Sequence, residues 1–561
     1  MVCKPSKRRA ALTLAGVVSG TIAGTAGTAV AGSFDTGNPD VTLRWDNTVK
    51  YSAAARVASR DPAVAGSIPN SNLDDGDLNF GRGLISNRFD LLSELDVAYA
   101  RKYGVRLSGA AWYDSVYNRK NDNDSPGTIN HSSTAYNEFT RDTRRLHGRN
   151  AELLDAFAYG NFDIGDKNLS LRAGRYTLLY GESLFLGANG IAAAQSSIDV
   201  VKALSVPNSQ FKEIGRPIGQ VSGQFQATDD LTLGAYYQLE WRKYRLPASG
   251  SYFSVADILD EGGEVLYASG PMFGPGGLYF GRGSDIKAKN SGQGGLQIRY
   301  KVSPNWEFGL YGANFHDKTP KIYVRPGVNA QGQTSFGTSI GDYVLVYPEN
   351  IQVYGASFAT VVGDTNISGE FSVRNNQPFA GANGDVFVDP TGLANGSGRR
   401  LYPVGKSAHV NISAISVLNG NSLWDGASLI GELGYNHRLT VDNDRPLDPR
   451  VTRGAWGTRI SFEANYFQVL PQVDLTVPIS VGYAFGGRSS LGPAVFGPEK
   501  GGDITIGLTA EYEKRWRMSL QYVKYFGAKG PLTLDPVQRE YSYKQTLADR
   551  DYVSLSLQTT F

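Results

Sequence analysis

Cysteine, methionine and net charge are the scarcest features of this 561-residue sequence. It contains one cysteine and three methionines, and its 55 lysines and arginines almost balance 53 aspartates and glutamates. One cysteine excludes metal sites and redox centres that are built from several thiols. The formal net charge of +2 gives no basic excess for a nucleic-acid partner, so we expect none.

Long apolar runs and catalytic signatures are also missing. Beyond the N-terminal segment, no stretch approaches the roughly 18 unbroken apolar residues of a membrane helix. The sequence has no phosphate-binding glycine loop, nucleophile elbow or zinc-ligand spacing. We therefore expect no cofactor and no bound metal.

Glycine and tyrosine are the abundant residues. There are 67 glycines, and 31 tyrosines outnumber 25 phenylalanines, while charged residues make up 19% of the chain. This composition is neither that of a disordered chain nor that of a helical membrane protein. It favours a large all-β protein outside the cytoplasm.

The N-terminus has the composition of an export signal. An apolar run of small residues spans 10–30, ends on Ala29-Val30-Ala31, and follows a basic start formed by Lys4, Lys7, Arg8 and Arg9. A membrane anchor is the alternative, but so much Gly, Thr and Ala would hold a helix poorly in lipid. We predict a signal peptide over residues 1–31. Its cleavage would also remove Cys3.

The C-terminal segment alternates between apolar and polar residues. In 552–561, Val553, Leu555 and Leu557 share one face with Phe561, and serine, glutamine and threonine occupy the other. A period of two is typical of a strand between lipid and water. The terminal aromatic residue resembles the recognition signal of bacterial outer-membrane barrels. Phe561 is therefore expected to act in membrane insertion, through the barrel-assembly machinery.

About 18 segments show the same alternation, among them 43–51, 89–99, 231–241, 473–483, 504–512 and 516–522. The connections between them alternate between short and long. Short turns at one rim and long loops at the other are typical of outer-membrane barrels, whereas a soluble β-sandwich has no reason to sort its loops. We predict an all-β, transmembrane antiparallel barrel of about 16–18 strands over residues 32–561. An even number of strands returns both termini to the periplasmic side.

Two sets of side chains fit this barrel. Aromatic residues near predicted strand ends would form interfacial girdles: Trp45, Tyr51, Tyr99, Trp241, Tyr300, Trp306, Trp424, Trp456, Tyr483, Tyr512 and Trp516. Charged residues of both signs fall on the lumen face: Arg44, Asp46, Lys50, Asp90, Glu94, Asp96, Arg106, Arg172, Arg299, Arg374, Arg459 and Glu463. We expect most of these charges to pair with one another in a wet lumen.

One stretch belongs neither to the wall nor to an ordinary loop. Residues 183–217 carry many apolar side chains, which an exposed loop would leave in water. We predict that this stretch folds into the barrel and narrows it; the alternative is a hydrophobic lid over the rim. The expected lumen and constriction residues are Arg172, Arg175, Tyr180, Glu182, Phe185, Asp199 and Lys202.

Four segments resemble a large proteobacterial outer-membrane family long catalogued only as a domain of unknown function. They are 74–80 (DDGDLNF), 148–160 (GRNAELLDAFAYG), 174–182 (GRYTLLYGE) and 250–254 (GSYFS). The resemblance covers essentially the whole mature chain. It implies a barrel that is often encoded beside a periplasmic lipoprotein-like partner. It also implies uptake or export of hydrophobic compounds such as alkanes, aromatics or steroids.

The sequence departs from that family inside the predicted constriction. Tyr180 stands where the family usually has Trp before Gly-Glu, and Ser196-Ser197 replaces the usual Asn-Pro. The family's substrate range is therefore not carried over to this chain. Our main hypothesis is a passive channel or transport port for small hydrophobic or amphipathic molecules. The alternatives are a general or anion-preferring porin that uses the arginine rows, and a structural or adhesive barrel that presents long loops.

An enzyme is not expected. Ser407, His409 and Asn411 share one face of a single strand, and outer-membrane phospholipases use these residue types. That face is the lumen face, however, whereas such a lipase acts on the lipid side. The period-two pattern produces a trio of this kind by chance.

Two loop features have competing interpretations. Asp75, Asp77 and Asn79 have the spacing that begins a calcium loop, but Phe80 and Ser86 stand where such a loop needs Gly and Glu. A second feature is the basic run Arg141, Arg144, Arg145, His147 and Arg149. It would either contact anionic lipopolysaccharide, an expected partner along with outer-membrane lipid, or only balance nearby aspartates such as Asp122, Asp124 and Asp142.

Overall fold

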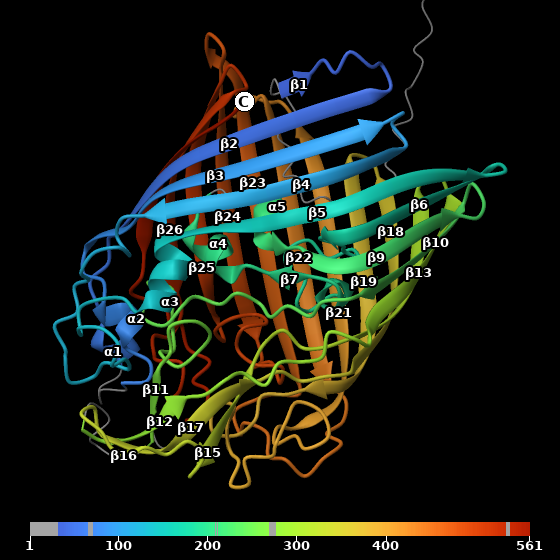
Figure 1. The fold of residues 1–561 in the computed structure, drawn as a ribbon. Coiled ribbons are helices and arrows are strands. Elements are labelled where there is room, and N and C mark those ends of the chain that lie inside the picture. The colour runs from blue at the N-terminus through green and yellow to red at the C-terminus, as the bar shows by residue number, and fades with distance from the viewer. Residues whose placement is uncertain (1–31, 66–70, 208, 210, 269–275, 535–538) are drawn as a thin grey trace, which may run out of the picture.

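A computed structural model describes residues 32–65, 71–207, 209, 211–268, 276–534 and 539–561. The predicted signal peptide lies outside the described residues. Eighteen strands close into one antiparallel barrel (Figure 1), which confirms the predicted fold and strand number. Each strand pairs with the next one along the chain. The barrel closes where Thr48 of β2 faces Thr560 of β27.

The barrel strands follow the chain order and are β2 (Val41–Arg56), β3 (Gly83–Tyr99), β4 (Tyr103–Asp114), β5 (Arg149–Ile164), β6 (Lys167–Tyr176), β9 (Ile218–Gln226), β10 (Leu231–Gln238), β13 (Gln293–Ser303), β14 (Trp306–Phe315), β18 (Ile351–Val362), β19 (Thr365–Pro378), β21 (Val404–Asn419), β22 (Gly426–Arg438), β23 (Gly454–Leu470), β24 (Val473–Gly486), β25 (Gly501–Tyr512), β26 (Trp516–Phe526) and β27 (Tyr552–Thr560). A short strand, β1 (Gly32–Phe34), pairs with β2 beyond the end of β27. There Phe561 exchanges backbone hydrogen bonds with Asn47.

The alternation along each strand separates an outer from an inner face. On β3, Phe89 and Tyr99 are exposed on the outside, whereas Glu94 is buried on the lumen side. On β27, Leu555 and Leu557 point outward, and Ser554 and Ser556 are buried. Apolar groups outside and polar groups inside are what a strand between lipid and a polar lumen requires.

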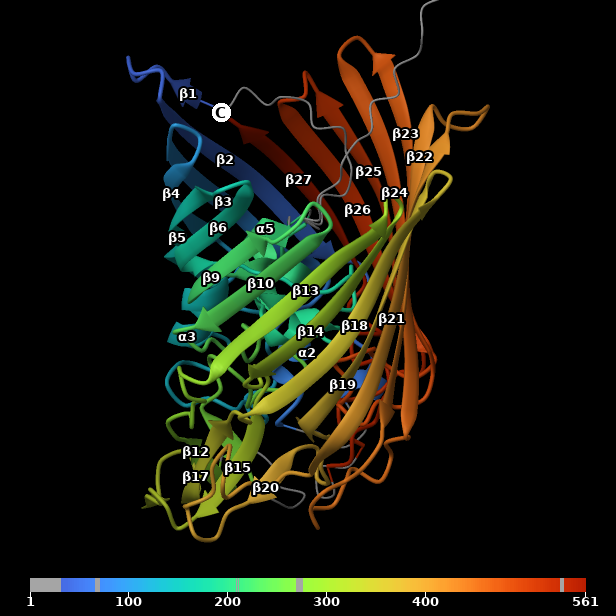
Figure 2. The ribbon, with the colours of Figure 1, turned by 90° about the vertical axis from the view of Figure 1, so that its right-hand side faces the viewer.

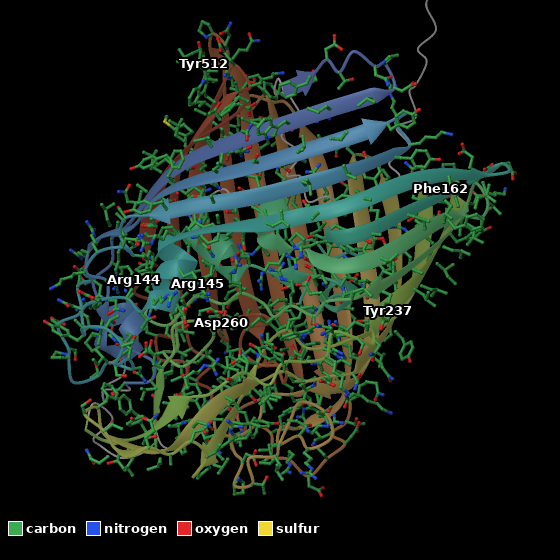
Figure 3. All side chains as sticks on the ribbon, in the orientation of Figure 1. Arg144, Arg145, Phe162, Tyr237, Asp260 and Tyr512 are labelled. Carbon is green, nitrogen blue, oxygen red and sulfur yellow. The ribbon has the colours of Figure 1, made fainter. Side chains whose placement is uncertain are left out.

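The connections are sorted by length. Short turns join β3–β4, β5–β6, β9–β10, β13–β14, β18–β19, β21–β22, β23–β24 and β25–β26, and they lie at the rim that also holds both ends of the described chain. The other connections are long. Figure 3 shows exposed Phe162 and Tyr512 near short turns, while Arg144 and Arg145 lie among the long connections at the opposite end.

The long connections fold into a cap over one end of the barrel (Figure 2). Its six-stranded sheet combines three connections and consists of β11 (Val265–Tyr267), β12 (Leu278–Arg282), β15 (Lys321–Pro326), β16 (Gly332–Gln333), β17 (Thr338–Val346) and β20 (Val386–Val388). Leu266, Tyr343 and Leu345 are buried in its apolar core. Trp241 belongs to this core and is 8% exposed, so the prediction that it joins an interfacial girdle is wrong.

Helices are short in the described residues. Near the cap they are α1 (Pro62–Ala65), α2 (Asp75–Leu78), α3 (Arg141–Thr143) and the π-helix η1 (Arg144–Gly148). None of the helices in the described part of the chain is long and apolar enough to cross a membrane.

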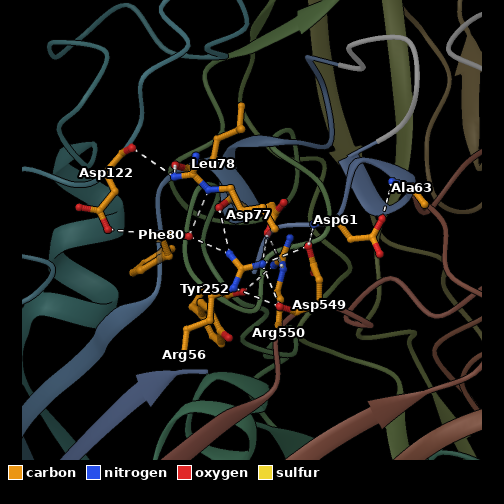
Figure 4. A network of polar contacts seen from close by, with 12 residues as sticks. Arg56, Asp61, Ala63, Asp77, Leu78, Phe80, Asp122, Tyr252, Asp549 and Arg550 are labelled. Carbon is orange, nitrogen blue, oxygen red and sulfur yellow. Dashed lines mark hydrogen bonds and ion pairs between the residues drawn. The ribbon is translucent and has the colours of Figure 1, made fainter. Parts of the chain in front are cut away.

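A buried ion-pair network ties the cap to the barrel (Figure 4). Arg56, at the end of β2, lies 2.7 Å from a carboxylate oxygen of Asp77 and 3.0 Å from one of Asp549. Arg550 donates to the backbone oxygens of Tyr252 (2.5 Å) and Ser254 (2.6 Å). Because these groups come from three separate connections and one strand, the network fixes the cap on the rim.

The aspartates considered for calcium have another role. Asp75 and Asp77 lie in helix α2, and Asp77 pairs with Arg56. Burial, together with the negative charge of Asp257, raises the pKa of Asp74 and Asp75 well above the usual range. Among the described residues, no group of three His, Cys, Asp or Glu side chains is arranged to hold a metal ion.

Candidate functional site

The connection from β6 to β9, residues 177–217, lies inside the barrel and is called the inserted segment below. It contains η2 (Ile191–Ala194), β7 (Ser197–Ile198), α4 (Val200–Ser205), α5 (Phe211–Ile214) and β8 (Gly215–Arg216). Both ribbon views place α5 between opposite walls (Figures 1 and 2). The inward fold predicted from the apolar composition of this stretch is confirmed. It is not a lid over the rim.

Two buried carboxylates of the wall hold the first half of the segment. Glu432 of β22 accepts hydrogen bonds from the backbone N–H groups of Leu184 (3.2 Å), Phe185 (2.5 Å) and Leu186 (2.8 Å). It also accepts one from the Ser183 hydroxyl at 2.8 Å. Glu370 of β19 accepts bonds from the backbone N–H groups of Glu182 and Ile191, at 2.8 and 2.9 Å.

Neighbouring polar side chains of the wall complete this attachment. Arg374 donates to the backbone oxygens of Ala188 (3.0 Å) and Gly190 (2.8 Å). The amide of Asn189 donates to the side chain of Asn411 at 2.6 Å and to the backbone oxygens of β21 and β22. The backbone of the segment therefore takes its partners from side chains of the wall.

The serine–histidine pair of β21 is part of the same attachment. Ser407 Oγ lies 2.8 Å from His409 Nε2, and His409 Nδ1 lies 3.0 Å from the Asn189 side-chain oxygen. The exposed fractions of Ser407 and His409 are 0% and 1%. Both side chains are buried, and His409 contacts and positions Asn189 of the inserted segment.

Two glycines of the wall allow the segment to pack closely. A Cβ atom on Gly355 would lie 2.8 Å from Ile191 Cδ1, and one on Gly434 would lie 2.8 Å from Leu186 Cδ1. Real Cβ atoms essentially never approach so closely, so a larger residue at either position would require the end of the Ile191 or Leu186 side chain to shift. Beside Ile191, three tyrosines form a buried cluster: Tyr180, Tyr236 and Tyr311.

The second half of the segment is held by ion pairs. Asp199 accepts a hydrogen bond from the backbone N–H of Lys202 and so caps helix α4. Its carboxylate lies 2.6 Å from the guanidinium of Arg245, which also pairs with Glu152 of β5 at 2.5 Å. Lys202 lies 3.3 Å from Glu152. These contacts join the segment to both the wall and the cap, because Arg245 lies in the connection after β10.

Helix α5 makes more exposed contacts with the neighbouring strands of the wall. Lys212 pairs with Glu94 of β3 at 2.5 Å, and Glu213 lies 3.6 Å from Lys50 of β2. The inserted segment thus bridges the lumen from β19, β21 and β22 on one side to β2, β3 and β5 on the other. Small cavities of about 20 Å³ and 10 Å³ remain between this second half and the wall.

The structure separates the predicted constriction residues into two groups. Tyr180, Glu182, Asp199 and Lys202 lie on the inserted segment and are buried, at 1–7% exposure. They hold the segment, and Lys202 also lines the cavity of about 20 Å³. Among the apolar side chains, Ile191 and Val201 are also buried against neighbouring residues, whereas Phe185 is 39% exposed.

The two predicted arginines lie on β6. Arg175 pairs with Glu240 at 3.0 Å, and the Arg172 guanidinium lies 6.0 Å from the ring centre of Phe157. By the strand register Arg175 has the outward orientation of exposed Leu171 and Val221, whereas Arg172 has the opposite one. Charges on the lumen face are paired, as predicted. Arg299 contacts Glu307 and lies 3.4 Å from Glu182, and Arg459 lies 2.7 Å from Asp503.

Sequence reasoning missed several residues of the site, among them Asn189, Arg245, Glu370 and Glu432. The two glutamates occupy inward positions of alternating strands, so their direction was predictable but their partners were not. Asn189 and Arg245 lie outside the barrel strands and follow no periodic pattern.

The comparisons with known proteins give a family and several distant structures. A family described as "Protein of unknown function (DUF1302)" matches residues 9–561. None of the curated proteins compared matches the chain.

Solved structures similar to this chain include Acinetobacter baumannii OccAB1, with a TM-score of 0.42, 10% identity, and coverage of 95% of this chain and 98% of that one. Pseudomonas aeruginosa OccD3 (OpdP) has a TM-score of 0.42 and 10% identity, with coverage of 95% and 93%. The outer membrane channel DcaP of A. baumannii has a TM-score of 0.37 and 9% identity, with coverage of 95% and 100%. These likenesses are too weak to support an argument about function.

Proposed function

The chain belongs to the DUF1302 family of proteins of unknown function, and we propose that it is a passive outer-membrane channel for small hydrophobic or amphipathic molecules. Its location follows from the 18-strand closed barrel, with apolar residues facing outward and polar residues facing the lumen. An apolar outer face of this kind is stable in lipid, and closure leaves no strand edge unpaired.

The crossing of the lumen by the inserted segment is the observation that carries the proposal. A barrel that served only as a membrane anchor would need no segment held by so many wall residues. Here Glu370, Glu432 and Arg374 hold one half, and Glu152 and Glu94 hold the other. A segment fixed at both walls sets the width of whatever path remains, as a constriction does in a channel.

The charge pattern supports a substrate without a strong net charge. On the lumen face, Arg299 and Arg459 each have a carboxylate partner. A neutralised pair exerts a weaker field on a passing ion than an unpaired row of arginines does. At the crossing, half-exposed Phe185 offers apolar surface. These two features favour an amphipathic or hydrophobic solute over a simple anion.

Single-channel recording in planar bilayers tests the constriction. We expect the wild-type protein to give small or no steps, and deletion of residues 184–208 to raise the conductance markedly. A matched deletion of the exposed cap tip 330–333 should leave the conductance unchanged. Equal conductance of the wild type and the 184–208 deletion would contradict the constriction, provided that both proteins remain heat-modifiable and β-rich.

Reversal potentials test the substrate class. With Arg172 and Arg175 changed to Gln, ion selectivity should barely shift if the path serves neutral or amphipathic molecules. A large loss of anion preference would support the anion-preferring porin instead. Uptake of hydrophobic compounds by cells that carry the wild-type or the segment-deleted protein then measures transport directly.

Assembly supplies a separate test of location. We propose that Phe561 acts as the C-terminal signal for insertion. Replacing it with Ala should lower the amount of barrel in the outer-membrane fraction, whereas replacing it with Tyr should not. The alanine variant would contradict this role if it assembled at the wild-type level.

A further inference from the structure

A hollow of about 1210 Å³, lined by polar and apolar side chains in similar measure, opens at the long-connection end of β18 and β19. Its floor includes Gln352 of β18 and Asn375 of β19, and its sides come from two cap connections, residues 388–401 and 442–445. The two amide side chains bond to each other at 3.0 Å. The hollow is far larger than the cavities inside the barrel, and nothing in the proposed permeation path uses it.

The hollow lies on the outside of the barrel. Gln352 pairs with Asn375 across the strands and has the same orientation as Tyr354, which is 60% exposed on the outer face. The inward positions of these strands are the alternate ones, such as Glu370 and Arg374, which bind the inserted segment. Gln352 and Asn375 therefore face away from the lumen.

The position along the strands corresponds to the membrane surface. Gln352 lies two residues beyond Tyr354, or about 7 Å along the strand at the usual rise. Tyr354 and Phe371 end the exposed apolar surface of β18 and β19 on this side, and polar residues follow. A hollow directly beyond a lipid-facing tyrosine lies at the level of the lipid headgroups.

Three arginines line the hollow: Arg399, Arg400 and Arg445. Within the described residues, none of them forms an ion pair with a carboxylate; Arg400 donates to the amide oxygen of Asn376. This contrasts with the paired arginines of the lumen. An unpaired guanidinium presents a planar set of donors that matches a phosphate group in a bidentate way.

The other polar groups suit a sugar. The side-chain amide of Asn350 can both donate to and accept from hydroxyl groups. The amide of Asn443 already accepts from the Val404 N–H and donates to the Tyr402 oxygen, which leaves one donor hydrogen and one lone pair. Three aspartates also line the hollow, but Asp389 is saturated by the backbone N–H groups of residues 391, 392 and 394, and Asp442 accepts from Thr440 at 2.7 Å. Asp444 is exposed and is available for hydroxyl groups.

We propose that this hollow binds the phosphorylated sugar headgroup of lipopolysaccharide in the outer leaflet. The arginines hold the phosphates, and the amides hold the sugar hydroxyls. The inference rests on the proposed outer-membrane location. It places lipopolysaccharide contact here and not on the basic run 141–149, where Arg145 is paired with Glu261 and His147 is buried.

Binding of purified lipid A to the detergent-solubilised full-length protein tests the inference. The variant Arg399→Gln/Arg400→Gln/Arg445→Gln is called the hollow variant. It should bind bis-phosphorylated lipid A at least about tenfold more weakly than the wild type, because the loss of a single charged hydrogen bond changes affinity by about tenfold or more. The matched variant Arg141→Gln/Arg144→Gln/Arg149→Gln should bind as the wild type does. Dephosphorylated lipid A should bind the wild type as weakly as the hollow variant.

Three results would overturn the inference. In the first, the hollow variant binds lipid A as tightly as the wild type does. In the second, the variant at 141, 144 and 149 loses affinity for lipid A instead. In the third, glucosamine 1-phosphate displaces lipid A from the wild type at equal concentration. The last result would mean that the site takes the soluble phosphorylated sugar. Measuring the conductance of the same preparations tests the proposed channel function independently of lipid A binding. A wild-type protein that forms no channel, but whose hollow variant loses lipid A, would contradict the channel and leave this inference standing.

Discussion

The two halves of the inserted segment are held by different interactions. In the first half, residues 182–191, backbone N–H groups donate to Glu370 and Glu432, which are 5% and 2% exposed. In the second half, residues 199–213, side chains form ion pairs with Arg245, Glu152 and Glu94. The first half is fixed through its backbone, whereas the second half is fixed mainly through side chains, with backbone hydrogen bonds to Arg245 only at Ile198 and Val200.

This difference indicates which part of the constriction can move. A carboxylate that accepts several backbone N–H groups fixes the path of the chain, whatever side chains the segment carries. Ion pairs of partly exposed lysines are weakened by salt and by the freedom of long side chains. The ion pairs of α4 are buried, since the side chains of Asp199 and Lys202 are 1% and 9% exposed. We therefore expect the first half and α4 to stay in place, and any widening of the lumen to begin at α5, whose Lys212 side chain is 46% exposed.

Removal of Glu432 should have the largest effect. In Glu432→Ala, three backbone N–H groups and one hydroxyl lose their acceptor, and each charge-assisted hydrogen bond is worth about 1.5–3 kcal/mol. The first half of the segment should detach from β22. A several-fold rise in mean conductance in planar bilayers is the expected result.

A neighbouring carboxylate provides the control. Glu463 of β23 is also buried on the lumen side and has no hydrogen bond to the inserted segment among the described residues. Glu463→Ala should leave the conductance near the wild-type value. If both alanine variants gave the same increase in conductance, the effect would come from the change in lumen charge and not from detachment of the first half of the inserted segment.

Replacement of Arg245 should have an intermediate effect. In Arg245→Ala, Asp199 and Glu152 lose their common partner, and breaking a buried pair costs about 3–5 kcal/mol. Helix α4 should loosen while the first half stays in place. Hydrogen exchange followed by mass spectrometry should therefore show faster exchange in 199–206 and unchanged exchange in 182–191.

The double variant Arg245→Ala/Asp199→Asn tests the cause. It removes the buried charge that the single variant leaves on Asp199, while Glu152 keeps Lys202 as a partner at 3.3 Å, so part of the protection in 199–206 should return. Exchange that also rises in 182–191 would show that the two halves are one unit, contrary to the comparison.

The wall was predictable from the sequence because lipid on one side and a polar lumen on the other impose a period of two. That pattern predicted that Phe89 faces outward and Glu94 faces the lumen. The lengths of the connections predicted which of them lie at the same rim. The inward fold of 183–217 was predictable from its apolar content. The contacts of the segment were not, because Glu370 and Glu432 lie 188 and 247 residues from the N–H groups of Glu182 and Phe185 that they bind.

The cap should respond to acidification through the buried carboxyl group of Asp257. Burial raises the pKa of Asp257 to about 6, so the folded cap binds a proton that the unfolded chain releases between about pH 4 and 6. Stability from this group is therefore gained as the pH falls through 6 and lost as it rises. Exchange of 71–80 and 250–260, corrected for the chemical rate, should slow from about pH 7.5 to 5.5, and Asp257→Asn should reduce this change. Faster corrected exchange at the lower pH would contradict the prediction.

The Lys212–Glu94 pair should give the smallest effect. The Lys212 side chain is 46% exposed, and pairs of this kind contribute about 0.2–1 kcal/mol. Lys212→Gln should therefore change the exchange of 211–214 slightly in dilute buffer and not at all in 1 M salt, where such a pair is already screened. The first half should be insensitive to the same salt step, because buried backbone hydrogen bonds do not depend on it. Equal salt sensitivity of 182–191 and 211–214 would remove the distinction between a rigid first half and a movable α5.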